Sequence, residues 1–226
     1  MILQTKHYVI EQIDQKKIED ECEISADYII CQSDVLDSVY EDKLISRGYR
    51  FLDRLLYFEI ETSIVKSSDD NVIQDVDFLC DREYDDVLFD TACQAYTTDR
   101  RFHLNPVFDQ QSADDVIEAF IDYCKKQDYK IYKAVHNNEL LGFAIVDDVD
   151  KNRAYFENIL GATKPGIKGK MIAGPLYKFM IKGENEKFKK YAGRVSSSNI
   201  ASINLHTALG GRVKKIYDEF IFDNRR

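Results

Sequence analysis

Residues 163–175 combine three lysines with three glycines and follow an apolar segment that is typical of a strand. The residues after them predict a helix, and the first N–H groups of a helix have no acceptor inside it. Together with the helix dipole, these groups favour an anionic ligand, for which a pyrophosphate is the natural candidate. A solvated loop with ordinary surface lysines explains this stretch equally well when it is taken alone. Neither a GxxxxGK[ST] phosphate loop nor a GxGxxG fingerprint is present.

A second polar group, formed by Asp99, Arg100, Arg101 and His103, follows a stretch of helical periodicity. Arginine binds phosphates through two parallel hydrogen bonds, so Arg100, Arg101 and His103 are candidates for holding the diphosphate of a substrate. A charged helix end explains the group at least as well. Glu157 lies in a predicted strand and is a candidate general base that acts through water. A solvated or salt-bridged glutamate is the alternative there.

The elements that position these residues follow from periodicity and turn signals. We expect strands over residues 26–31, 49–61, 72–76, 129–135, 140–146, 153–162, 191–196 and 213–222. We expect helices over 37–47, 84–95, 112–124, 171–182 and 199–209, the third capped by Ser112 with Asp115 in a capping box. Pro175 is expected in the first turns of its helix, where its missing N–H costs little. The most polar stretch, residues 66–71, has the composition of a linker and predicts a boundary between two units.

The loop at 163–175 resembles the cofactor loop of the GNAT acyltransferase superfamily, whose motif is Q/R-x-x-G-x-G/A after a bulged strand. Pro165, Gly169 and Ala173 fit the family's loop, Lys168 replaces Gln or Arg, and Met171 replaces a glycine. A side chain at that position would crowd a pyrophosphate. The resemblance implies acetyl-CoA as the acyl donor and no metal. The residues it implies for binding the donor are Leu160, Gly161, Ala162, Thr163, Lys168, Gly169, Lys170, Met171, Ile172, Ala173 and Asn199.

Residues 199–211 resemble a second GNAT segment, N-x-x-A-x-x-x-Y-x-x-x-G-F, in which Asn contacts the cofactor and Tyr protonates the departing thiolate. Asn199 and Gly210 match, His206 occupies the tyrosine position, and Gly211 replaces Phe. Asn199 and His206 are seven residues apart, about two helical turns, so both point the same way. An imidazole with a pKa near 6.5 can donate a proton at neutral pH, so His206 is a candidate acid. A histidine packed against the sheet is the alternative.

Residues 96–106 are similar to the D-S-R-F-x-x-D-P segment of sugar-amine GNAT proteins of the TDP-fucosamine acetyltransferase type. Residues 26–61 are similar to the small N-terminal region of those proteins, which consists of a strand, a helix and a long strand. This resemblance implies a nucleotide-linked amino sugar as one candidate acceptor.

Composition excludes other classes of function. The 226 residues contain 31 Lys and Arg against 40 Asp and Glu, for a formal net charge of −9, so we expect no nucleic acid as a partner. No run approaches about 18 apolar residues, and the first residues lack a basic segment followed by an apolar run, so we expect neither a membrane partner nor a signal peptide. The five cysteines lack CxxC spacing, which favours reduced thiols, a cytoplasmic protein and no metal site.

The sequence therefore predicts an α+β (α/β) fold with a GNAT-like mixed, mostly antiparallel, twisted sheet flanked by helices. A small N-terminal α/β subdomain would occupy residues 1–68 and a GNAT-like acyl-CoA-binding domain residues 69–226. The predicted activity is N-acetyl transfer from acetyl-CoA to a primary amine of a small molecule by direct attack. The alternative is a catalytically degenerate GNAT-like protein that binds a ligand or a partner. A homodimer is compatible with either.

Overall fold

The computed structural model describes residues 2–4, 8–11, 28–65, 75–97, 101–148 and 154–223. The strands are β1 Ile2–Gln4, β2 Tyr8–Glu11, β3 Tyr28–Asp34, β4 Arg50–Glu61, β5 Val76–Asp81, β6 Lys130–His136, β7 Glu139–Asp147, β8 Tyr155–Thr163, β9 Lys190–Ser196 and β10 Arg212–Asp223. The helices are α1 Ser38–Ser46, α2 Asp86–Tyr96, α3 Gln110–Lys126, α4 Ile167–Glu184 and α5 Ile200–Ala208, with a short 3₁₀ helix at Thr62–Ile64.

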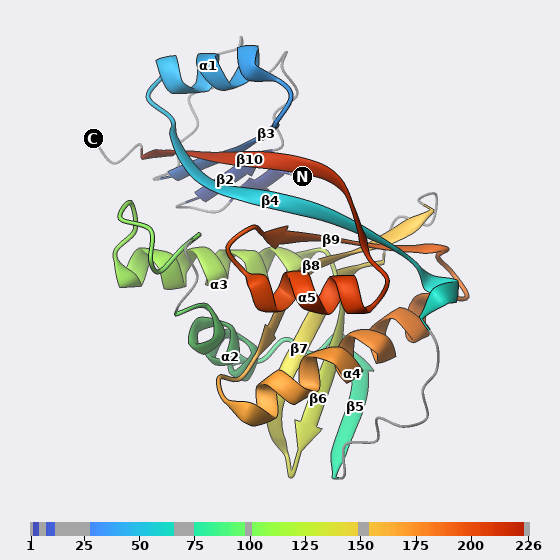
Figure 1. Cartoon of the computed structure of the whole chain (residues 1–226). Coiled ribbons are helices and arrows are strands. Elements are labelled where there is room, and N and C mark those ends of the chain that lie inside the picture. The colour runs from blue at the N-terminus through green and yellow to red at the C-terminus, as the bar shows by residue number, and fades with distance from the viewer. Residues whose placement is uncertain are drawn as a thin grey trace.

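The described strands form one sheet in the order β1-β2-β3-β10-β4-β9-β8-β7-β6-β5. Neighbouring strands are antiparallel except β2 with β3 and β8 with β9, which are parallel. The sheet twists strongly, so that β4 and β10 cross the upper half of Figure 1 while β5, β6 and β7 stand nearly upright below them. This arrangement confirms the predicted mixed, mostly antiparallel α/β fold.

Helices cover both faces of the sheet. Ile172, Leu176 and Met180 of α4 pack into one apolar core with β6, β7 and β8, and Leu205 and Leu209 next to it come from α5 and its end. In Figure 1, α4 and α5 lie together in front of the strands. Helices α2 and α3 pack on the opposite face through Leu88 and Ile117. Helix α1 covers β3 and β10 through a separate small cluster.

Strand β10 lies between β3 and β4, so a C-terminal strand is hydrogen-bonded on both edges to N-terminal strands. Helix α3 also reaches these strands, because Val116 and Phe120 pack with Ile30 and Leu52. The residue ranges 1–68 and 69–226 thus share one sheet. The predicted linker at 66–71 lies outside the described residues, and the division into two domains stays a prediction.

Helix α4 differs from its predicted extent. It begins at Ile167 rather than Met171, and Pro175 therefore lies inside the helix rather than in its first turns. Gly166 precedes it with φ 110°, a backbone conformation that is open to glycine alone in practice. Because Gly166 can make this sharp turn, the helix starts directly after β8, and Lys168, Gly169 and Lys170 form its first turn instead of a loop.

Two further predictions were wrong in detail. The strand expected at 72–76 overlaps β5 only at Val76, since Asp75 lies in a turn with φ 66° and residues 72–74 lie outside the described part of the chain. Val76 and Phe78 pack against the core next to α4. The cap of α3 is Asp109, whose carboxylate accepts a hydrogen bond from the Ser112 N–H at 2.7 Å. Ser112 is thus the third residue of the helix, because Gln110 and Gln111 precede it inside the helix.

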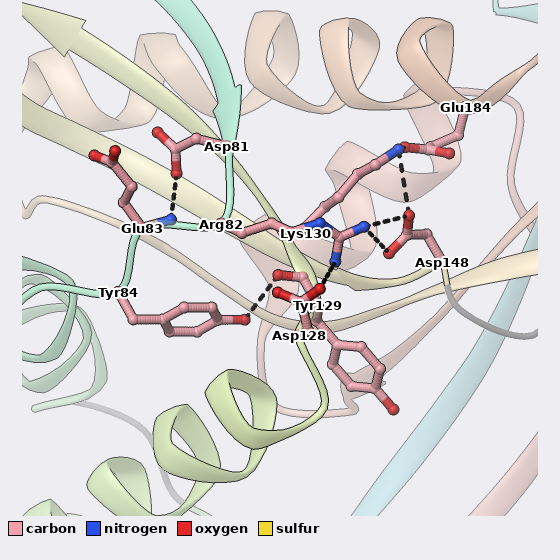
Figure 2. Close-up of polar contacts among 9 residues, drawn as sticks. All are labelled: Asp81, Arg82, Glu83, Tyr84, Asp128, Tyr129, Lys130, Asp148 and Glu184. Atoms are coloured by element: carbon pink, nitrogen blue, oxygen red, sulfur yellow. Dashed lines mark hydrogen bonds and ion pairs between the residues drawn. The ribbon is translucent and has the colours of Figure 1, made fainter.

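A network of charges fixes the C-terminal end of α4 against the sheet (Figure 2). Lys130 of β6 binds the buried Glu184 and also lies 3.3 Å from Asp148, which Arg82 reaches at 3.1 Å. Burial is the largest single influence on the pKa of Lys130 and lowers it, but the hydrogen bond to Glu184 and the charges of Glu184 and Asp148 contribute to a combined effect that outweighs burial and raises that pKa. Tyr132 adds a 2.6 Å hydrogen bond to Glu184. The far end of α4 is thereby anchored, which sets where its N-terminus lies beside β8.

Among the described residues, no helix is both long enough and apolar enough to cross a membrane.

Candidate functional site

The parallel strands β8 and β9 separate partway along their length. They pair from Tyr155 with Lys190 as far as Asn158 with Gly193, and no pair follows. Strand β8 also carries a bulge where it pairs with β7, because Leu160 faces Ile145 while Asn158 faces Val146, which leaves Ile159 as an extra residue. A bulge bends a strand and increases its local twist. The bend at Ile159 therefore opens a gap between β8 and β9.

Backbone groups of β8 face this gap. The Lys164 N–H donates to the Leu141 carbonyl at 2.8 Å, and hydrogen-bonded pairs alternate along an antiparallel ladder. Ala162 is thus bonded to β7, whereas Gly161 and Thr163 direct their N–H and C=O groups away from it. The Tyr96 hydroxyl confirms this direction for Gly161, because it donates to the Gly161 carbonyl at 2.8 Å. The gap consequently exposes two peptide units for an extended ligand.

A cavity of about 90 Å³ occupies the gap. Part of its wall comes from the α4 and α5 face of the sheet, through Asn158, Tyr177, Asn199, Ser202 and His206. The rest comes from the α2 and α3 face, through Tyr96, Arg101, Phe102, Ile117 and Phe120. A single cavity lined from both faces must pass through the sheet, and the separation of β8 from β9 is what allows it.

Tyr177 of α4 brings a hydroxyl to the middle of this cavity. The side chain packs so closely over β8 that a Cβ added to Gly161 would lie 2.5 Å from the Tyr177 hydroxyl. Asn158 contacts the same hydroxyl at 3.0 Å. With its oxygen accepting from Tyr177, the Asn158 amide nitrogen donates to the Ile145 and Leu160 carbonyls at 3.2 Å, across the bulge. Burial raises the pKa of Tyr177 to about 12, so the hydroxyl keeps its proton at neutral pH.

His206 lies on the same side and is only 1% exposed. Its Nδ1 is 2.8 Å from the Ser202 carbonyl oxygen, which can only accept, so Nδ1 carries the proton. Its Nε2 is 2.8 Å from the Tyr191 hydroxyl and accepts from it. Burial lowers the pKa of His206, while the bond to Ser202 partly opposes that shift. The ring is therefore neutral at neutral pH and has both nitrogens engaged.

Asn199 caps helix α5, as its carboxamide oxygen accepts from the Ser202 N–H at 3.0 Å. Asn199 and His206 both line the cavity. They lie about two helical turns apart and face the same way, as their spacing predicts. The nearby hydroxyls of Ser196 and Ser198 bond to each other at 2.8 Å. This end of the cavity is consequently polar and uncharged.

The first turn of α4 follows the gap directly. Gly166, which precedes that turn, has no side chain that could accept from its N–H groups, so these groups remain available to a ligand. A Cβ at Gly166 would meet nothing within 4 Å, so the turn borders open space. Met171 is 60% exposed and Ile172 is buried in the core, so the two residues face opposite ways. The side chains of Lys168 and Lys170 lie outside the described part of the structure.

The wall on the α2 and α3 face carries charge. Arg101 forms an ion pair with Glu219 of β10, with Nε at 2.6 Å from the carboxylate, and its guanidinium lies over the Phe102 ring. Arg194 of β9 lies 3.3 Å from Glu157 of β8. Both arginines line the cavity.

The structure places only some of the predicted site residues at the cavity, and Ala162 and Ile172 are buried in the apolar clusters on either side of the sheet. Leu160, Gly161, Asn199, His206 and Arg101 line the cavity. Glu157 lies behind Arg194, and His103 is paired with Asp114 of α3 at 2.8 Å, away from the cavity. Arg100 lies outside the described residues.

Sequence reasoning missed most of the residues that line the cavity, among them Tyr96, Asn158, Tyr177 and Arg194. Asn158 and Arg194 interrupt the apolar pattern of their strands, and that irregularity is a usable signal in the sequence. The two tyrosines carry no such signal, because each completes an apolar helix face.

The fold is similar to that of solved structures of other proteins. A functionally unknown conserved protein from Staphylococcus epidermidis is 15% identical with a TM-score of 0.62, over 93% of this chain and 77% of that one. A tandem GNAT protein from the clavulanic acid biosynthesis pathway is 12% identical with a TM-score of 0.57, over 88% of this chain and 65% of that one. A GCN5-related N-acetyltransferase from Kribbella flavida is 11% identical with a TM-score of 0.57, over 88% of this chain and 69% of that one.

These likenesses show a GNAT-like fold, and the chain spans about two thirds of the length of the two GNAT proteins. No family model matches the chain, and no curated protein matches it.

Proposed function

We propose that this chain is an N-acyltransferase that moves an acetyl group from acetyl-CoA to a primary amine of a small molecule. The observation that carries the proposal is the cavity that passes through the sheet between β8 and β9, with the peptide units of Gly161 and Thr163 facing the gap. Such a passage lets two substrates approach from opposite faces and meet in the middle. The GNAT-like fold supports the same activity.

The donor would lie along β8 with its pyrophosphate at the start of α4. The free N–H groups of the first helical turn, those of Ile167, Lys168 and Gly169, favour an anion there. The amide groups of an extended pantetheine chain match the N–H and C=O groups of Gly161 and Thr163. This placement brings the thioester to the bulge, beside Asn158 and Tyr177.

The transfer needs no covalent enzyme intermediate. The amine nitrogen attacks the thioester carbonyl carbon, the C–S bond breaks, the amine loses a proton to a base and the CoA thiolate takes one up. The Gly161 N–H is placed to stabilise the oxyanion that forms on the carbonyl oxygen. Glu157, the carboxylate of β8, is our proposed base, and it would act through water because it does not line the cavity itself.

Two side chains compete for the role of the acid that protonates the thiolate. His206 occupies the position that the family resemblance implies, but its ring is neutral and its Nε2 accepts from Tyr191. The Tyr177 hydroxyl holds a proton and lies directly against Gly161. We therefore propose two alternatives for the acid: His206, which the family resemblance favours, and Tyr177, which the geometry favours.

Substitution separates them. If His206 is the acid, His206→Gln lowers kcat at least about tenfold, a typical contribution of general acid–base catalysis, while Tyr177→Phe changes it little. The opposite result assigns the proton to Tyr177. The dissociation constant of acetyl-CoA, measured for each variant, separates a lost proton donor from a damaged cavity.

A nucleotide-linked amino sugar is one candidate acceptor. The residues that would hold its diphosphate are Arg100, Arg101 and His103. His103 is already paired with Asp114, which makes Arg101 the best placed of the three. The donor and the small-molecule amine are the only ligands that the proposal requires.

Calorimetric titration with acetyl-CoA, free CoA and ATP tests the proposal. Binding of acetyl-CoA at micromolar affinity, with ATP at least about 100-fold weaker, supports the donor site, since such affinity corresponds to about 8 kcal/mol. Absence of acetyl-CoA binding would overturn it. Binding without transfer to any amine would favour the second candidate, a GNAT-like ligand-binding protein, for which the fully engaged, neutral His206 is the supporting observation.

A further inference from the structure

The charged side chains that line the cavity are cationic, although the chain as a whole is acidic. The chain has a formal net charge of −9, yet the charged residues among those that line the cavity are two arginines, Arg101 and Arg194. Both belong to the wall on the α2 and α3 face, whereas the opposite wall is built from amides, hydroxyls and a neutral histidine. The two ends of the passage therefore differ in electrostatic potential.

Arg101 is held rigidly toward this end. Glu219 binds it through two contacts, Nε at 2.6 Å and an NH2 hydrogen bond at 2.7 Å. Glu219 is fully buried and also accepts from Gln32 at 2.8 Å, so it cannot swing into the cavity. The guanidinium carbon lies 4.9 Å above the centre of the Phe102 ring. The aromatic rings and the carboxylate thus fix Arg101 from behind while it borders the cavity.

Arg194 approaches from the other strand of the gap. Its only ion pair in the described part of the chain is with Glu157 at 3.3 Å. Its Nε is buried and has no hydrogen-bond partner among the described residues. A buried donor without an acceptor is costly, and a bound anion would satisfy it. Arg194 therefore supplies the observation that points to a ligand.

Both carboxylates lie behind the arginines, since neither Glu157 nor Glu219 lines the cavity. A ligand in the cavity thus meets the guanidinium groups before it meets a carboxylate. The volume of about 90 Å³ is smaller than that of a roughly 150 Å³ cavity that accepts a benzene ring. The enclosed part of an acceptor must be small.

We infer that the acceptor is a small primary amine that also carries an anionic group, a carboxylate or a phosphate, which Arg101 and Arg194 bind while the amine points toward β8. The inference rests on the proposed function, because it assigns the passage on the α2 and α3 face to the acceptor. Arginine suits either anion, since its planar donors match the oxygens of both.

Matched pairs of amines that differ in the anionic group test the inference. β-Alanine is compared with β-alanine amide, and O-phosphoethanolamine with ethanolamine, each titrated by calorimetry into the protein saturated with free CoA. We expect the anionic member of at least one pair to bind about tenfold or more tightly than its neutral partner, the effect of one or two charged hydrogen bonds. The pair that shows the larger ratio distinguishes carboxylate from phosphate.

Variants assign the preference to the arginines. Arg194→Gln should reduce the ratio within the preferred pair to about threefold or less, while leaving the neutral amine unchanged. Arg101→Gln is made together with Glu219→Gln, so that no unpaired carboxylate is left buried. Arg82→Gln, in the charge network at the far end of α4, is the matched control and should leave the ratio unchanged.

Equal binding within both pairs would overturn the inference, as would a nucleotide-linked amino sugar that binds more tightly than every small amine. Failure of the proposed function has a different signature, namely no binding of acetyl-CoA. In that case the same pairs are titrated into the free protein, where the ratio and its loss in Arg194→Gln still decide whether the cavity selects anions.

Discussion

His206 shows how surroundings decide the chemistry of a side chain. Its ring packs between the rings of Phe58 and Tyr177, with centroid distances of 5.2 and 5.5 Å. Its two nitrogens are bound to Ser202 and Tyr191. A charge on this ring would be buried without a carboxylate partner. The folded protein therefore favours the neutral imidazole.

This burial predicts acid sensitivity. The pKa of His206 is lower in the folded protein than its ordinary value of about 6.5 in the unfolded chain. Between those two values the unfolded state binds more protons, so the free energy of unfolding falls as pH drops below about 6.5. Urea unfolding at several pH values should show a smaller loss in His206→Gln than in the wild type. Parallel curves for the two proteins would contradict the prediction.

Gly161 is a second residue whose identity the cavity requires. In Gly161→Ala the new methyl would lie 2.5 Å from the Tyr177 hydroxyl, so the ring must move. We expect a loss of about 1–3 kcal/mol in the free energy of unfolding, the usual cost of overpacking. Acetyl-CoA binding should weaken as well, and both are measured on one preparation.

The double variant Gly161→Ala/Tyr177→Phe is the control. It removes the clashing oxygen and leaves the ring carbon that bore it at 3.5 Å, an ordinary contact. Most of the lost stability should return. If it does not, the strain lies in the backbone of β8 and not in the contact with Tyr177.

Among the elements, α4 joins the candidate site to the charge network at its other end. Its N-terminus borders the gap and its C-terminus is held by the network of Lys130, Asp148 and Glu184 (Figure 2). The helix contains glycines in two different surroundings. A Cβ on Gly174 would have only an ordinary contact, 4.0 Å from Leu205, whereas a Cβ on Gly183 would lie 2.7 Å from the Tyr132 hydroxyl that binds Glu184.

Alanine at these two positions should therefore have opposite effects. Gly174→Ala should stabilise the protein by about 0.5–1 kcal/mol, because alanine favours the helix and nothing obstructs it. Gly183→Ala should destabilise it by about 1–3 kcal/mol, since the methyl displaces Tyr132. Urea unfolding of both variants measures the difference, and stabilisation by both would show that the end of α4 is loosely held.

The elements were predictable where a local pattern defined them. The strands predicted at 129–135 and 140–146 form a hairpin, whose turn places Asn137 and Asn138 at φ 50° and 64°, values that asparagine tolerates. The helix predicted over 37–47 is α1, and Gly48 follows its end at φ 89°. The start of α4 was wrong by four residues, because glycine and lysine suggested a loop. Gly166 has a positive φ, which allows the helix to begin at Ile167. The presence of a glycine does not by itself predict a positive φ, so the sequence did not reveal this start.

The candidate site was less predictable than the fold, because it depends on pairing between distant segments. The bulge at Ile159 and the end of the β8–β9 ladder at Asn158 follow from three-dimensional packing. Neither leaves a periodic signal in the chain. Arg194 and Tyr177 became cavity residues only when β9 and α4 were placed on either side of that gap. Resemblance located Asn199 and Gly161, because motifs record such positions directly.

At the level of the whole molecule, β10 joins the beginning of the chain to its end. It pairs with β3 over seven residues and with β4 along nearly its whole length. Arg54 of β4 adds two hydrogen bonds to Asp218 at 2.6 and 2.7 Å. These contacts tie residues 28–61 to the remainder as tightly as neighbouring strands within either range are tied.

We therefore expect the molecule to unfold in a single transition. The calorimetric enthalpy should equal the van't Hoff enthalpy, the signature of two-state unfolding. Asp218→Asn should lower the temperature of that single transition without splitting it. Two separate transitions, of which only one shifts in Asp218→Asn, would instead support independent units at 1–68 and 69–226.

The gap between β8 and β9 also leaves the sheet locally incomplete, which makes the exchange of amide hydrogens with deuterium a sensitive reporter. The Gly161 and Thr163 amides should exchange quickly in the free protein, while Ala162, paired with Phe143, exchanges slowly. Acetyl-CoA lying along β8 would slow the first two and leave the third unchanged. A ligand that binds only the folded state also stabilises it, by an amount that grows with the logarithm of the ligand concentration once this exceeds the dissociation constant. The resistance of this protein to degradation in the cell would then rise and fall with the supply of its own acyl donor.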